Sequence, residues 1–141
     1  MKYFVVLIIA FSASLVFLSG CAKVEQDVIG EWKSELMKDN PTAEVTWEFK
    51  TDGTLVRTYI DNPSNTTEVD ECFYSVEKKL TKTLIKIDGS INVSEYENLN
   101  GIWQVEYFND NMMKLRRIDK VLDTKDREDG SYLYREFTRV N

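Results

Sequence analysis

The residue types that carry most enzyme chemistry are missing from this chain. None of its 141 residues is histidine, which is the commonest general base near neutral pH and the commonest transition-metal ligand. A serine–histidine or cysteine–histidine nucleophile is therefore excluded. No Gly-rich phosphate loop and no Cys-x-x-Cys pair occurs. The sequence predicts a protein that is not an enzyme and that holds no cofactor and no metal.

Acidic side chains gather in two places where they could act together. Glu68, Asp70 and Glu71 could supply the paired carboxylates of a glycosidase, but no apolar pocket is implied there, so we interpret them as solvated charges. A second group could hold calcium and comprises Asp119, Asp123, Asp126, Glu128 and Asp129. Its spacing lacks the Asp-x-Asp-x-Asp-Gly pattern of a calcium loop, and we expect a solvated loop over 119–130.

Cys21 follows a segment with the layout of an export signal. Lys2 gives a positive start, 3–18 is an apolar run broken only by two serines, and Ser19 and Gly20 are small. The run is shorter than the ~20 apolar residues that cross a bilayer comfortably. A plain secretory signal and an uncleaved anchor helix are the alternatives to a lipoprotein signal.

The segment Leu18-Ser19-Gly20-Cys21 resembles the lipobox of bacterial lipoproteins. The resemblance implies cleavage before Cys21, which then carries a lipid thioether and an acylated amine. Several acyl chains together anchor a protein stably, whereas one binds only marginally. Ala22 stands where some bacteria use aspartate for inner-membrane retention, so an outer-membrane address is favoured and the leaflet stays open.

The body behind the anchor is acidic and small. The full chain has 18 basic and 24 acidic residues, so removal of Lys2 with residues 1–20 leaves 121 residues with a net charge of −7. This charge argues against nucleic acid and against docking on anionic headgroups, and it suits a basic partner. With Cys21 lipidated, Cys72 has no disulfide partner, and we expect it to be a half-buried strand residue rather than a reactive thiol.

Alternating apolar and polar residues predict strands along most of the body. The clearest pair places Val45, Trp47 and Phe49 before the turn 51–54, whose Asp-Gly favours a hairpin. Arg57 and Tyr59 follow on one face of the next strand. Eight strand-like segments are expected in total, at 29–36, 45–49, 54–59, 69–76, 83–87, 102–108, 112–118 and 132–140.

This even series of short strands is typical of an antiparallel barrel or sandwich. We predict an all-β fold, a small antiparallel up-and-down barrel, because closure removes exposed edges. The expected organisation is a signal peptide over 1–20, a lipidated tether over 21–28 and one barrel domain over 29–141, with a possible extra strand or turn within 90–100.

Several of these segments resemble bacterial lipocalin-like lipoproteins. Those domains open with a Gly-x-Trp strand, seen here as Ile29-Gly30-Glu31-Trp32, and close with an aromatic strand ending in Arg, seen here as 134–139. Trp47-Glu48-Phe49 and Asp52-Gly53-Thr54-Leu55 match the hairpin between them. The resemblance implies that Arg139 packs over Trp32 and closes the barrel base, so that both residues are structural. The short chain argues against a deep calyx.

An eight-stranded barrel is wide enough to be filled by side chains or to hold one small ligand. The candidate lining residues for an apolar ligand are Trp47, Arg57, Tyr59, Tyr74, Trp103 and Tyr107, with Arg57 or Arg117 pairing with a polar head group. The same rings could simply fill the core. Whether Arg57 points inward is left open by the pattern.

Three functions remain open, and the third is a structural envelope component with no discrete ligand. The first is a membrane-anchored, lipocalin-like binder of a small apolar molecule in or at the mouth of the barrel. The second is a protein-interaction module with a filled barrel, acting as an inhibitor of a basic envelope enzyme or as an accessory subunit of a surface complex.

Overall fold

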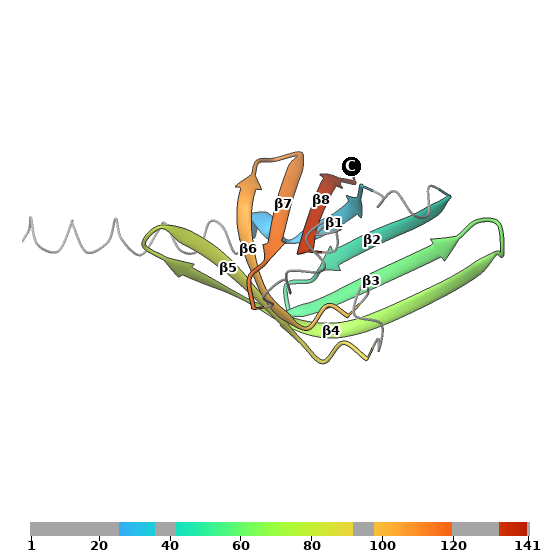
Figure 1. Ribbon diagram of the computed structural model, residues 1–141, viewed down its shortest axis with the longest axis horizontal. Helices are drawn as coiled ribbons and strands as arrows, with labels where there is room; N and C mark the ends of the chain where they lie inside the picture. Colours follow the sequence, from blue (N-terminus) through green and yellow to red (C-terminus); the bar gives the residue numbers. More distant parts are fainter. Residues whose placement is uncertain (1–25, 36–41, 92–97, 120–132, 141) are drawn as a thin grey trace, which may run out of the picture.

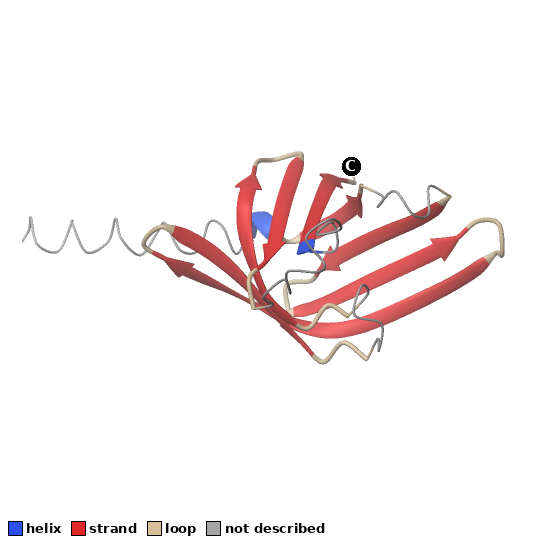
Figure 2. Ribbon diagram, in the orientation of Figure 1, coloured by secondary structure: helices blue, strands red, loops and turns tan. Residues whose placement is uncertain are grey.

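The computed structural model is a closed antiparallel barrel of eight strands (Figures 1 and 2), which confirms the expected fold. It describes residues 26–35, 42–91, 98–119 and 133–140. Segments 1–20 and Cys21, where the signal and the anchor are expected, lie outside these residues, as do most of the carboxylates in 119–130. The strands are β1 Gly30–Ser34, β2 Ala43–Phe49, β3 Thr54–Asp61, β4 Thr66–Lys79, β5 Lys82–Asp88, β6 Gly101–Phe108, β7 Met112–Arg117 and β8 Tyr134–Arg139.

Each strand pairs with its neighbours in sequence, and β1 closes on β8 through Trp32↔Arg139, Lys33↔Thr138 and Ser34↔Phe137. Connections therefore alternate between the two ends of the barrel. We call one end the Trp32 end, where β1 begins, β8 finishes and the β2–β3, β4–β5 and β6–β7 turns lie. The opposite end, where β6 begins, is the Trp103 end.

Alternate residues point into the barrel, and aromatic rings fill its middle. Trp47 is 1% exposed and lies against three other rings, with centroid distances of 6.2 Å to Phe49, 5.8 Å to Trp103 and 4.9 Å to Phe137. Leu55, Ile85 and Leu115 are fully buried among them. Each such side chain contributes about 1.5–3 kcal/mol on burial, so the interior rings account for much of the fold's stability.

One strand is longer than its pattern indicates. The sequence predicts a strand at 69–76, but β4 has 14 residues and reaches Lys79. Beyond Phe73 its register continues with β5 alone, up to Lys79↔Lys82. The last residues of β4, Glu77 to Lys79, are polar, so the alternation of apolar residues fades there. On the other strand of the hairpin, β5 stays paired with β6, and its Leu84, Ile85 and Ile87 are buried. Among the residues that the structure describes, no helix has the length and apolarity that crossing a membrane requires.

Candidate functional site

The Trp32 end is closed by a tryptophan and an arginine. The Trp32 ring is fully buried, its Nε1–H donates to the Val28 carbonyl at 2.9 Å, and Arg139 Cζ lies 4.1 Å from the ring centroid. Arg139 also donates to the carbonyls of Asp27 at 2.5 Å and Ile29 at 3.1 Å. The contact that the resemblance implies between these two residues is therefore present, and it ties the N-terminal segment to this end.

The Trp103 end carries a second plug of the same design. Trp103 is 1% exposed, its Nε1–H donates to the carbonyl of Leu99 at 2.9 Å, and Arg117 Cζ lies 5.6 Å from the ring centroid. Leu99 is buried in the core as Val28 is. The two Gly-x-Trp motifs and their preceding apolar residue have equal spacing, Val28-x-Gly30-x-Trp32 and Leu99-x-Gly101-x-Trp103. The equal spacing is the signal in the sequence for this second plug.

Glycine is required at the centre of the second plug. Gly101 has a φ of +145°, and an added Cβ would lie 2.5 Å from an Asp119 carboxylate oxygen and 2.9 Å from Arg117 Nε. The Arg117 guanidinium donates to Asp119 at 3.1 Å and to the backbone carbonyls of Asn98, at 3.0 Å, and Asn100. Arg117 therefore holds the start of β6 and its preceding connection in place.

Asp70 is a buried acid beside this plug. It is 4% exposed, and it accepts hydrogen bonds from Ser90 Oγ at 2.5 Å and from the Ile91 amide at 3.3 Å. The expectation of a solvated charge was wrong for this residue. Asp70 lies two residues before Cys72 and four before Tyr74 on β4, so all three share its inward face. This even spacing was the signal in the sequence that Asp70 is buried.

Arg57 lies on the inward face next to Asp70. It is 6% exposed, and its Cα is paired in register with Trp47 on one side and Asp70 on the other. Its Cζ lies 5.6 Å from the Tyr59 ring centroid. The orientation that the pattern left open is thus inward, at the level of the Trp103 end. Charged groups are costly to bury even when they are paired, so a barrel that needed only to be filled would not require them here.

Arginine also approaches Trp103 from β8. Arg135 Cζ is 5.8 Å from the Trp103 ring centroid, so guanidinium groups from both β7 and β8 lie near this indole. We call Arg57, Asp70, Ser90, Trp103, Arg117 and Arg135 the polar-end cluster. It is the part of the described interior where ionisable side chains gather.

The remaining predicted lining residues have different places. Trp47 belongs to the packed ring core, and half-buried Tyr74 donates to the Lys50 carbonyl at 2.8 Å near the Trp32 end. The inward position expected for Tyr107 is wrong, because this residue is 51% exposed. A β-bulge between Val105 and Tyr107 shifts the alternation by one residue, so Phe108 takes the inward place.

Cys72 is fully buried rather than half-buried. Burial, followed by the nearby charge of Asp70, raises the pKa of its thiol to about 12, and Sγ–H donates to the Leu55 carbonyl at 3.6 Å. A thiol with so little thiolate near neutral pH is a poor nucleophile and a poor metal ligand. Within the described ranges no group of three or more histidine, cysteine or carboxylate side chains is arranged to hold a metal.

Comparison of the chain with known protein families, curated proteins and solved structures finds no match. The function must therefore be argued from the residues of the barrel themselves.

Proposed function

We propose that this protein is a membrane-anchored, lipocalin-like lipoprotein that binds a small apolar molecule bearing an acidic or polar head group at the Trp103 end of its barrel. Lipid on Cys21 would hold it in the cell envelope, at the outer membrane. The closed eight-stranded barrel, its Gly-x-Trp opening and its final arginine are consistent with this class.

The observation that carries the proposal is the burial of charge in the polar-end cluster. Arg57, Asp70 and Arg117 are each no more than 6% exposed. A barrel that needed only to be filled would be as stable with apolar side chains at these positions. Guanidinium groups beside aromatic rings, as at Tyr59 and Trp103, are suited to a ligand with an anionic head and an apolar body.

The filled middle of the barrel limits where such a ligand binds. Trp47 packs against Phe49, Trp103 and Phe137, and no deep calyx is expected in so short a chain. A ligand would therefore sit at the mouth, with its head group near Arg57 and Arg135 and its apolar part over Tyr59.

Native mass spectrometry of the domain purified from its own host tests this proposal. A reproducible small-molecule adduct is expected, and fatty acids or sterol-like acids should raise the melting temperature by mass action. Arg57→Gln should abolish that ligand-induced rise, whereas Arg116→Gln, on the outer face of β7 and paired with Glu106 at 2.8 Å, should preserve it. A clean mass together with no stabilisation by any compound would overturn the proposal.

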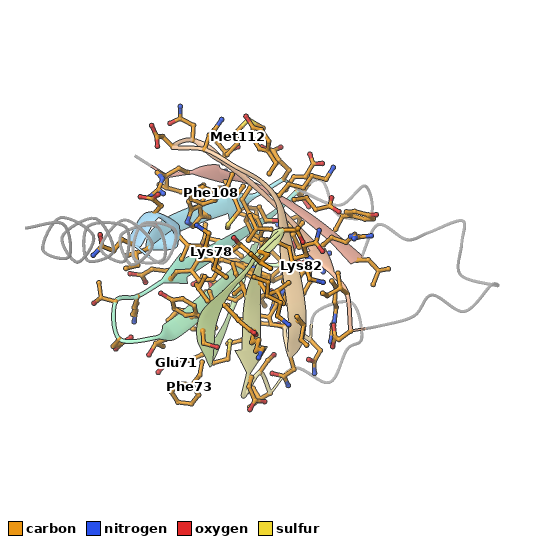
Figure 3. The ribbon with its side chains drawn as sticks, turned by 90° about the vertical axis from the view of Figure 1, so that its left-hand side faces the viewer. Glu71, Phe73, Lys78, Lys82, Phe108 and Met112 are labelled. Carbon is orange, nitrogen blue, oxygen red and sulfur yellow. The ribbon has the colours of Figure 1, made fainter. Side chains whose placement is uncertain are left out.

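An acidic and apolar strip on the outer face favours a second candidate, a protein-interaction module. Val69 is 59% exposed and Phe73 is 69% exposed on β4, with exposed Glu71 between them. Figure 3 shows Glu71 and Phe73 at the periphery of the barrel. Apolar side chains next to a carboxylate suit a basic partner. Pull-down at low salt, compared with Phe73→Ser, would identify such a partner.

A further inference from the structure

The start of the barrel domain is fixed at the Trp32 end. The Asp27 and Ile29 carbonyls accept from Arg139, and the Val28 carbonyl accepts from Trp32. From Gln26, where the described chain begins, five residues lead back to Cys21. Five residues span at most ~18 Å, so an anchor on Cys21 holds the Trp32 end near the membrane.

The β4–β5 hairpin projects from this same end. Beyond Phe73, β4 continues from Tyr74↔Ile87 to Lys79↔Lys82, past the β3 pairing that ends at Thr54↔Phe73. At ~3.4 Å per residue, these six residues carry β4 ~20 Å past its pairing with β3. On the other side of the hairpin, β5 stays paired with β6 as far as Thr83↔Val105. Figure 1 shows the hairpin reaching further out than the β2–β3 turn.

The hairpin tip, residues 78–82, combines lysines with a fully exposed leucine. Lys78, Lys79 and Lys82 are exposed, and Leu80 is 107% exposed. Figure 3 looks onto this end, with Lys78 and Lys82 near the middle of the view. Neither Leu80 nor Thr81 has a positive φ, and neither is the Asn, Asp or Gly that two-residue turns prefer. Turn geometry therefore does not explain the leucine.

Like charges also face one another at the tip. Lys79 and Lys82 are Cα partners across the hairpin, and like charges directly opposite are destabilising. Glu77 offsets part of this charge, at 3.6 Å from Lys79 and 2.8 Å from Lys86. Lys82 forms no ion pair with any residue that the structure describes. Three lysines against one glutamate over 77–82 make this tip basic on a chain whose net charge is −6.

We propose that the hairpin tip is a second membrane contact, in which Lys78, Lys79 and Lys82 bind anionic lipid headgroups and Leu80 inserts between them. The Trp32 end then faces the bilayer, and the polar-end cluster faces away from it. The net charge of the whole chain is acidic and argues against such docking. However, the potential of anionic headgroups falls off within a Debye length of the surface, so the local charge of the hairpin tip decides whether it binds. The orientation rests on the proposed lipid at Cys21.

The test supplies the anchor chemically, so that it does not depend on lipidation in the cell. A chain beginning at Cys21 retains the whole barrel and its core, and it is coupled through Cys21 to maleimide lipid in vesicles. Buried Cys72, with its raised pKa, stays unreacted. Leu80→Trp reports insertion, because the three native tryptophans are at most 1% exposed. Ile91→Trp is the matched control, since Ile91 is 81% exposed and follows β5 at the Trp103 end.

On vesicles of equal parts phosphatidylcholine and phosphatidylglycerol, Leu80→Trp emission should shift to the blue and be quenched by brominated lipid. Ile91→Trp should show neither effect. Replacing Lys78, Lys79 and Lys82 by glutamine should weaken insertion about fivefold per lysine, whereas Lys33→Gln on β1 should not. Emission of Leu80→Trp that is unchanged on anionic vesicles, or insertion that survives loss of all three lysines, would overturn the proposal.

Discussion

Two arginines illustrate how one residue type takes different roles at the two barrel ends. Arg139 Cζ lies 4.1 Å from the Trp32 ring centroid, and the guanidinium donates to carbonyls of the N-terminal segment and to the Asp110 backbone carbonyl, the last at 2.8 Å. Arg117 lies further from Trp103, at 5.6 Å, and its donors hold the β5–β6 connection and Asp119. The first arginine seals a hydrophobic end, whereas the second belongs to a cluster of buried charges.

Replacement of Arg139 by methionine should lower the free energy of unfolding by about 2–3 kcal/mol, because a close cation–π contact and three hydrogen bonds to carbonyls are lost together. Urea unfolding measures this difference. Arg116→Met is the control, since its ion pair with Glu106 is partly exposed and should contribute less than about 1 kcal/mol. Equal effects of the two substitutions would contradict the sealing role of Arg139.

The β2–β3 hairpin is the element where sequence and structure agree most closely. Asp52 accepts from the Thr54 amide at 2.9 Å, and Gly53 has a φ of +84°. The positive φ at Gly53 is what the Asp-Gly pair predicts, and the Asp52 hydrogen bond is a local contact that Asp side chains commonly make in turns. The hydrogen bond from the Thr54 backbone amide is the largest cause that lowers the pKa of Asp52 below its ordinary value of 3.8.

This lowered pKa predicts a pH dependence. The ionised Asp52 is favoured in the folded state, so its stabilisation is present above the ordinary pKa and is lost as the pH falls through the lowered value. Between about pH 5 and pH 2, the wild-type protein should lose stability relative to Asp52→Asn. Because the cause is mainly a hydrogen bond rather than a distant charge, the difference should persist in high salt. A difference that is constant with pH would count against this account.

Strand number and closure were predictable because the barrel buries one face of each strand and so preserves period two. Two local departures were not predictable. The bulge after Val105 reverses the faces of Tyr107 and Phe108, and single-residue insertions leave no mark in an apolar pattern. The outer part of β4 has no buried face, so nothing in its polar sequence marks it as strand.

The candidate site was predictable only in part, for a related reason. Arg57, Tyr59 and Trp103 were expected as lining residues, and the structure places all three toward the Trp103 end. Asp70 and Ser90 come from separate strands or connections, and only the fold brings them within hydrogen-bond distance. From the sequence alone, a charged residue at an inward position is expected to be solvated, because its partner in space is not known.

At the scale of the whole molecule, the barrel is filled in its middle and differs at its two ends. The Trp32 end has the fixed N-terminal segment and the basic hairpin tip, and the Trp103 end has the buried charges. If the first faces a membrane, the second is presented to the surrounding medium. Membrane attachment and ligand binding would then lie at opposite ends of the barrel.

Removal of a large side chain tests whether the middle of the barrel is tightly packed. Trp47→Ala should cost about 3–5 kcal/mol in urea unfolding, because the ring contacts three others and the site cannot fully collapse. The variant should also gain affinity for small apolar molecules such as benzene, as engineered apolar cavities do, while the wild-type protein should not bind them there. Tyr107→Ala, at an exposed position, should change stability by no more than about 0.5 kcal/mol. If Trp47→Ala cost as little as Tyr107→Ala and the wild-type protein already bound benzene, the middle would already hold space, and a ligand site deep in the barrel would replace the one at its mouth.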